Sequence, residues 1–261
     1  MPEVFKIDLS RQRRSLMGYS AGMAAYALVV VAMYPAFKNS TSLDNLIRSD
    51  STAAALFGIT GSISSSSGWL NGNLYANFYP LVMLLLTIGY GASCIAGQDE
   101  DGTLGLVATL PVRRAAMVAQ KAAAMALQAT ALALALGVCV AVGRFFDLKT
   151  SIVAALSLSC AVALLGLDLG FVTMAIGALT GKRGTALGLG SAVAGASYLV
   201  SSLAPVVSWL RPARYVSVFY WAIGNGHASG GVSGVDYAVL IGVGAVGLAV
   251  AGAAFGRLDL H

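Results

Sequence analysis

The chain has 261 residues, of which 57% are hydrophobic and 10% are charged, and its mean hydropathy is +0.79. Soluble domains carry about 25% charged residues, so this composition excludes a soluble domain with an ordinary polar surface. Several apolar runs reach the roughly 20 residues that cross a bilayer. Such runs also exclude a transmembrane β-barrel, whose strands are short and alternate in polarity. We therefore expect an all-α integral membrane protein that forms one transmembrane domain over residues 1–261.

Residues that could carry catalysis or bind nucleic acid are few. The net charge of +5 would suit a nucleic acid or an anionic membrane face, but the basic residues are spread over separate short loops, which disfavours nucleic acid. The three cysteines, Cys94, Cys139 and Cys160, lie inside apolar runs without metal-ligand spacing. His227 and His261 form no catalytic set with Ser and Asp. We expect no enzyme activity, and no cofactor or metal held by this chain.

The start of the chain combines an amphipathic pattern with the first apolar run. Phe5, Leu9 and Leu16 recur at helical spacing. The basic residues around them are Lys6, Arg11, Arg13 and Arg14. This pattern predicts a basic interfacial helix on the anionic inner leaflet, followed by a first crossing at residues 17–36.

Five more crossings are expected from the hydropathy pattern. They lie at residues 78–96, 111–143, 152–179, 185–207 and 237–255, with polar outer segments at 38–75 and 208–236. Lys and Arg concentrate in cytoplasmic loops, and here they are denser on the side of the termini. We therefore expect both termini to be cytoplasmic in a cell (plasma or inner) membrane. The third crossing is longer than a bilayer requires, so Arg113, Arg114 and Lys121 should project into the cytoplasm.

Two segments of the chain resemble nucleotide-binding motifs but are not expected to bind a nucleotide. Residues 242–247 fit GxGxxG but lie inside an apolar crossing, so their glycines are expected to let helices approach closely. Gly181 and Lys182 resemble part of a P-loop. However, Ile176 stands where that motif requires Gly, and Arg183 where it requires Ser or Thr. This chain is therefore expected to bind no nucleotide.

Asp168 is the one acid deep inside a crossing, between Gly166 and Gly170. A charge at the centre of a membrane helix costs about 3 kcal/mol on insertion scales, so this carboxyl should meet a partner, a polar cavity or a subunit interface. Two interpretations stay open. Asp168 is either a translocation or gating residue, or it makes an interhelical hydrogen bond to a Ser or Thr.

The densest cluster of charge lies between the second and third crossings. In chain order it comprises Asp99, Glu100, Asp101, Gly102, Thr103, Leu104, a short apolar segment, Pro111, Val112, Arg113, Arg114 and, seven residues further on, Lys121. Acids at the start of a short helix favour its dipole. Leu104, Val107 and Ala108 share one face by their spacing, and Pro111 suits the first turn of the next helix.

This ordered pattern resembles the segment between the second and third crossings of type-2 ABC exporter permeases. That family shows an acidic patch, Gly-Thr-Leu, a short apolar helix, Pro-Val-x-Arg, and a Lys seven residues after that Arg. This chain differs from the family pattern at two positions. Gly105 stands where a Glu usually follows Gly-Thr-Leu, and Arg113 stands where a small polar residue is common. The amphipathic start, residues 34–37 and residues 68–71 also look like the antibiotic-exporter branch, so the resemblance covers most of the chain.

The resemblance implies a coupling helix that docks into a separate ABC ATPase subunit, which would bind ATP and Mg²⁺. The interface residues it implies are Asp99, Glu100, Asp101, Gly102, Thr103, Leu104, Val107, Pro111, Arg114 and Lys121. Arg114 and Lys121 would pair with acids on the ATPase or with membrane lipid headgroups. Two copies of the chain, or one copy and a related chain, would enclose a pathway for an amphipathic or hydrophobic substrate such as a drug, an antibiotic or a lipid-like molecule.

Two functions from other classes stay open at this point. A proton-coupled secondary transporter would use Asp168 and would work without an ATPase. A structural or assembly factor would show no transport under either driving force.

Overall fold

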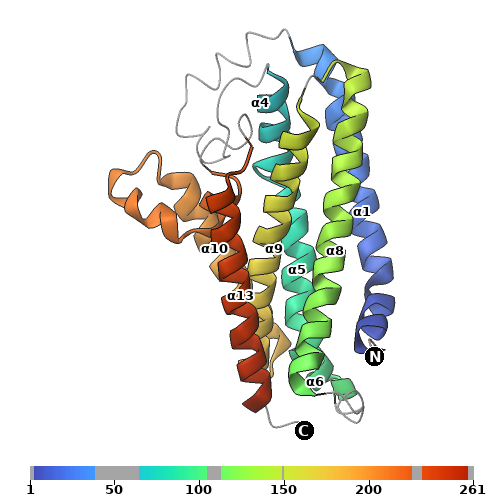
Figure 1. Cartoon of the computed structure of the whole chain (residues 1–261), viewed down its shortest axis with the longest axis vertical. Helices are drawn as coiled ribbons and strands as arrows, with labels where there is room; N and C mark the ends of the chain where they lie inside the picture. The colour runs from blue at the N-terminus through green and yellow to red at the C-terminus, as the bar shows by residue number, and fades with distance from the viewer. Residues whose placement is uncertain (1–2, 39–64, 105–112, 149, 225–230, 258–261) are drawn as a thin grey trace.

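The computed structural model describes residues 3–38, 65–104, 113–148, 150–224 and 231–257. These residues form a bundle of long antiparallel helices in which the start of α1 and the end of α13 lie at the same end (Figure 1). Within the described ranges, six helical segments are long and apolar enough to cross a membrane. They are α1 (Glu3–Phe37), a second span (Ser66–Glu100), a third (Arg114–Phe146), α9 (Ile152–Thr180), α10 (Arg183–Leu203) and α13 (Gly234–Arg257). The predicted all-α membrane fold is confirmed.

α1 runs as one uninterrupted helix of 35 residues, about 52 Å long at 1.5 Å per residue. It packs along α8 (Arg114–Val142), with Val4 and Asp8 buried. Its basic residues Lys6, Arg11, Arg13 and Arg14 are exposed. The structure therefore does not separate the predicted interfacial helix from the first span. The basic turns instead extend that span beyond the roughly 30 Å of apolar bilayer.

The second span is built from consecutive helical pieces. They are α4 (Ser66–Leu70), η1 (Asn71–Tyr75), α5 (Phe78–Ala92), η2 (Ser93–Gly97) and α6 (Gln98–Glu100). The interruption at Ala76 and Asn77 has a local cause, because the ring of Pro80 conflicts with the carbonyl four residues earlier. η1 and η2 are wider π-helical turns, which occur frequently at functional sites. η2 leads directly into Gln98, where the candidate site begins.

α9 is the central helix, and it packs against α5, α8, α10 and α13. Glycine permits the close crossing with α5, because a Cβ on Gly91 would lie 2.5 Å from the carbonyl oxygen of Gly170. Gly244 and Gly247, from the GxGxxG run in α13, also pack against α9. The predicted packing role of these two glycines is therefore confirmed.

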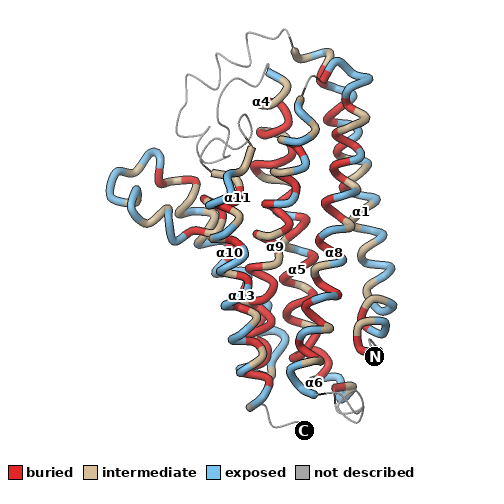
Figure 2. The backbone as a smooth tube through the Cα atoms, viewed as in Figure 1, coloured by how far each residue is buried: buried red, intermediate tan, exposed pale blue. Residues whose placement is uncertain are grey.

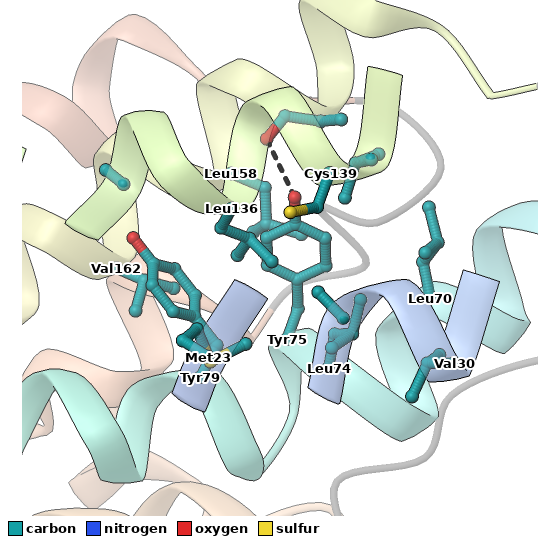
Figure 3. Close-up of a cluster of buried hydrophobic side chains, with 14 of the residues drawn as sticks. Met23, Val30, Leu70, Leu74, Tyr75, Tyr79, Leu136, Cys139, Leu158 and Val162 are labelled. Atoms are coloured by element: carbon teal, nitrogen blue, oxygen red, sulfur yellow. Dashed lines mark hydrogen bonds between the residues drawn. The ribbon is translucent and has the colours of Figure 1, made fainter. Parts of the chain in front are cut away.

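A large buried cluster in the half of the bundle away from the termini joins α1, the second span, α8 and α9 (Figure 3). Two tyrosine hydroxyls find partners inside it. Tyr75 Oη hydrogen-bonds Ser159 Oγ at 2.9 Å, and Tyr79 donates to the Ser159 carbonyl at 3.1 Å. A buried hydroxyl without a partner is costly, so these bonds favour one register of α9 against the second span.

Most residues of α10 are not buried. Exposed and intermediate segments of the chain are pale blue and tan in Figure 2. The buried residues of α10, Ala186, Gly190, Ala194 and Ser202, share one face. The chain then forms a lobe of short helices, η4 (Ser208–Leu210), η5 (Pro212–Val216) and α11 (Val218–Ala222), which projects from the side of the bundle (Figure 1, orange). Parts of the predicted outer segments, residues 39–64 and 225–230, lie outside the described residues.

Candidate functional site

Figure 1 shows the end of the bundle that holds the start of α1 and the end of α13. Charged and polar groups from several helices bind one another there. Five pieces of chain meet there, and together they are called the charged end. They are residues 3–12, 97–104, 113–121, 180–184 and 254–257. The segment between the second and third spans, with its three acids, therefore lies beside the first turns of α1 and α10 and the last turn of α13.

α6 ends in a turn that favours glycine. Gly102 has a φ of +66°, and its N–H donates to the carbonyl of Asp99 at 3.0 Å. Thr103 Oγ1 closes the turn by donating to the carbonyl of Gln98 at 3.3 Å. Asp101 is exposed beside this turn, as is the glycine itself. The Gly-Thr pair of the predicted motif thus has a local structural role.

Not every predicted interface residue is available to a partner. Val107 and Pro111 lie outside the described residues. Leu104 was expected to offer its side chain to an apolar groove, but it is fully buried in the same cluster as Val4 and Met117. In this structure, the Leu104 side chain is not open to a partner. Its side chain is already removed from solvent by α1 and α8, which satisfies the hydrophobic effect within this chain.

Two other charged residues of the predicted interface bind within the chain. Glu100 Oε1 accepts from the N–H of Arg183 at 2.9 Å, at the N-terminal end of α10, where negative charge is favourable. Arg114 donates to the carbonyls of Phe255 and Gly256, at 3.4 and 3.1 Å, at the C-terminal end of α13. These bonds attach the segment between the second and third spans to the last two spans.

Lys121 is buried inside the bundle, although it is also a predicted interface residue. Its side chain is 1% exposed, and its Nζ lies 3.2 Å from Asp8 Oδ2 and donates to Gln98 Oε1 at 2.7 Å. Gln98 Nε2 donates to Asp8 Oδ1 at 2.9 Å, and the Tyr90 hydroxyl donates to Asp8 Oδ2 at 2.9 Å. A buried charge must be paired and hydrogen-bonded, and Asp8 meets that requirement. Asp8, Tyr90, Gln98 and Lys121 are called the polar cluster.

Sequence reasoning did not include Asp8, Tyr90 or Gln98 in the site. A general signal was present, because Lys121 lies within an apolar helix and a lysine buried at membrane depth pairs with an acid. Nothing local identifies that acid, since Asp8 is 113 residues earlier in the chain. The register of α1 against α8 decides the pairing.

Comparison with known families decides the class of protein to which this charged end belongs. A family model described as ABC-2 family transporter protein matches residues 3–260. The chain belongs to the ABC-2 transporter family. No curated protein matches it. Membership confirms the resemblance to type-2 ABC permeases, whose members are membrane transport subunits, generally not enzymes, that generally work with an ABC ATPase.

This ABC-2 permease has an apolar groove between α5 and α10, on the open side of α10. The cavity has a volume of about 390 Å³, and its wall is mostly aliphatic, with Leu81, Leu85 and Leu187 among the lining side chains. Its lining also includes two polar side chains that bind each other, because the Tyr198 hydroxyl donates to Asn77 Oδ1 at 2.8 Å. The groove can therefore hold an apolar molecule and offers polar groups at one place.

Asp168 lies between α9 and α13 of the permease, and it is not among the residues that line this groove. The residue is 1% exposed, and a Cβ on Gly244 would lie 2.6 Å from its Oδ1. Its Oδ2 has no hydrogen-bond partner in the part of the chain that the structure describes. The geometry thus places Asp168 at a helix-packing interface, without a Ser or Thr bond to Oδ2 among the described residues.

Proposed function

We propose that this ABC-2 permease is the membrane subunit of an ATP-driven exporter, and that a separate ABC ATPase binds at the charged end. One observation carries the proposal. Asp101, Gly102 and Arg113 are exposed there, while their neighbours Glu100 and Arg114 hold the same segment to α10 and α13. An exposed segment that is attached to several spans is suited to pass a push from a partner to the whole bundle.

The proposed interface keeps the residues that the structure leaves accessible. They are Asp99, Glu100, Asp101, Gly102, Thr103 and Arg114. Val107 and Pro111, which lie outside the described residues, stay in the proposed interface as sequence predictions. Leu104 and Lys121 are not part of it, because both are buried in this chain. The acids would face basic side chains of the ATPase, and ATP and Mg²⁺ would be bound by that subunit.

The proposed orientation puts the charged end in the cytoplasm, where ATP is available. The exposed basic residues Lys6, Arg11, Arg13, Arg14, Lys182 and Arg183 lie at this end. Such residues concentrate on the cytoplasmic side of membrane proteins and contact anionic lipid headgroups. Both termini would then be cytoplasmic in the cell membrane.

A second permease, either another copy or a related chain, would complete the pathway. On α10, no neighbouring atom lies within 4 Å of the Cβ positions of Gly184, Gly188 and Gly195. Small residues on an open membrane helix let another helix approach closely. A partner on this side would enclose the α5–α10 groove, whose aliphatic wall suits an amphipathic or hydrophobic substrate such as a drug, an antibiotic or a lipid-like molecule.

The proton-coupled alternative centred on Asp168 is not favoured, because ABC-2 membership implies an ATPase. The two functions can be distinguished by measuring the uptake of a hydrophobic fluorescent dye into inverted membrane vesicles. The vesicles contain the permease, with or without the ABC ATPase. The exporter requires both ATP and the ATPase and continues when the pH gradient is collapsed. Uptake driven by a pH gradient alone, and abolished by Asp168→Asn, would contradict the exporter proposal.

A further inference from the structure

The polar cluster contains a closed ring of side chains from three helices. Asp8 of α1 accepts from Gln98 of α6 at 2.9 Å and from Lys121 of α8 at 3.2 Å, and Gln98 accepts from Lys121 at 2.7 Å. Tyr90 of α5 adds a further bond to Asp8 at 2.9 Å. None of these residues is more than 6% exposed, and none has a buried polar side-chain atom without a partner. The ring is therefore buried, and its polar side-chain atoms have partners within the ring.

This ring is the polar attachment between the start of α1 and the end of the second span. α1 packs along α8, but its contacts with η2 and α6 are sparse. A polar cavity of about 230 Å³ lies in that region, with Asp8, Ser93, Gln98 and Arg183 among its lining residues. Side-chain bonds to Gln98 thus join α1 to α6 beside this cavity, together with the apolar packing of Val4 and Leu104 in one buried cluster.

We propose that Asp8 is a positioning residue for energy coupling. It fastens the start of α1 to Gln98, which directly precedes the exposed acids, so that α1, α6 and the start of α8 move as one body when the ATPase acts on the segment. Charge-assisted hydrogen bonds between buried groups are strong and directional, so the ring can carry this displacement. The inference rests on the proposed docking of an ATPase at the charged end.

A second ion pair gives a matched control. Lys38, just after α1, lies 2.8 Å from Asp147, just after η3 (Gly143–Phe146), at the opposite end of the bundle. It joins the same two spans, but its side chains are 35% and 64% exposed. Exposed pairs are screened by water and contribute little, so Lys38→Gln removes an α1 ion pair without touching the ring.

The main test variant is Gln98→Leu, which cuts both ring bonds to α6 but leaves the Asp8–Lys121 pair in place. The permease is reconstituted with the ABC ATPase in vesicles of phosphatidylethanolamine and phosphatidylglycerol. Three quantities are measured: the ATPase bound, the ATP hydrolysed, and the hydrophobic dye moved per ATP. For Gln98→Leu and Asp8→Asn we expect normal ATPase binding, but dye moved per ATP should fall by about fivefold or more, a typical coupling effect. Lys38→Gln should behave as the wild type.

A variant in which Asp8 and Lys121 are exchanged tests whether the dye moved per ATP can be restored. Asp8→Lys combined with Lys121→Asp keeps opposite charges in contact, and the amide of Gln98 can reverse to serve both, so this double variant should recover most of the dye moved per ATP. Normal dye movement per ATP in Gln98→Leu, with the ATPase bound, would overturn the inference. If Asp8→Asn does not fold, Gln98→Leu decides alone, because it leaves the charges paired. Failure of the proposed function looks different: the wild-type permease would then not bind the ATPase.

Discussion

The crossing of α5 and α9 gives a stability prediction that can be worked from the structure. A Cβ added at Gly91 would lie 2.5 Å from the carbonyl oxygen of Gly170 and 3.3 Å from the backbone nitrogen of Met174. These are backbone atoms, so no side-chain rotation makes room. An ordinary C···O contact is about 3.3–3.6 Å, so α5 and α9 must separate by about 0.8–1.1 Å in the Gly91→Ala variant.

The magnitude follows from two opposing effects. Overpacking costs about 1–3 kcal/mol, whereas alanine in place of a helical glycine recovers about 0.5–1 kcal/mol. We therefore expect Gly91→Ala to lose about 1–2 kcal/mol of stability. Gly89→Ala is the matched control, because Gly89 lies on the same helix with no neighbouring atom within 4 Å of its Cβ position. That variant should be as stable as the wild type or more stable.

The assay is the thermal midpoint of the permease purified in a mild detergent, read from the fraction that stays monodisperse after heating. One heating rate is used for all variants, because unfolding of large proteins is often irreversible. Gly91→Ala should melt lower than the wild type, by about 2–4 °C for each kcal/mol lost. If Gly91→Ala proves as stable as Gly89→Ala, the close crossing of α5 and α9 is wrong.

Charged side chains give three more predictions. Asp168→Asn removes a buried acid whose Oδ2 lacks a partner among the described residues. We therefore expect the thermal midpoint to stay equal or rise, and ATP-driven dye uptake to persist. Lost uptake with normal ATPase binding would instead indicate a translocation role for Asp168. Arg114→Ala removes the donor to the last carbonyls of α13, so backbone amides near Gly256 should exchange hydrogen faster, and unchanged exchange would contradict the contact. Hydrogen bonding to Asp147, and then its charge, raise the pKa of Lys38, so this pair stabilises below the ordinary lysine pKa and is lost as pH rises through the raised value. The small difference in midpoint between wild type and Lys38→Gln should therefore vanish at strongly alkaline pH and in high salt, and a difference that persists there would argue against the pair.

The six spans could be predicted from the sequence because hydropathy is a local property. A run of about 20 apolar residues needs a bilayer or a core wherever it lies in the fold. The packing role of Gly244 and Gly247 could be assigned for a similar reason, since an apolar helix offers no strand or acid for a dinucleotide site, whereas no neighbouring atom lies within 4 Å of the Cβ position of Gly242. Hydropathy does not determine the register of one span against another. It therefore could not show that α1 continues unbroken from its basic turns into the membrane.

The candidate site depended on such long-range register, and here prediction was partial. The acids and Gly102 were found because they interrupt apolar sequence and form a local turn. Lys121 and Leu104 were assigned to the surface by their place in a motif, but their surroundings come from α1, more than a hundred residues away for Lys121. A pattern in one segment does not show which distant helix packs against it. The burial of Lys121 and Leu104, and the proposed role of Asp8, could therefore be inferred only from the structure.

The proposed docking of an ABC ATPase at Asp101 and Gly102, the exposed residues after α6, can be tested directly. The most direct measurement places a photo-reactive amino acid at Asp101 and, in a separate variant, at Asp147 on the opposite end of the bundle, in cells that express the permease with its ATPase. We expect an adduct of permease and ATPase from position 101 and none from position 147. A transport-competent complex that gives no adduct at 101, or equal adducts at both positions, would contradict it.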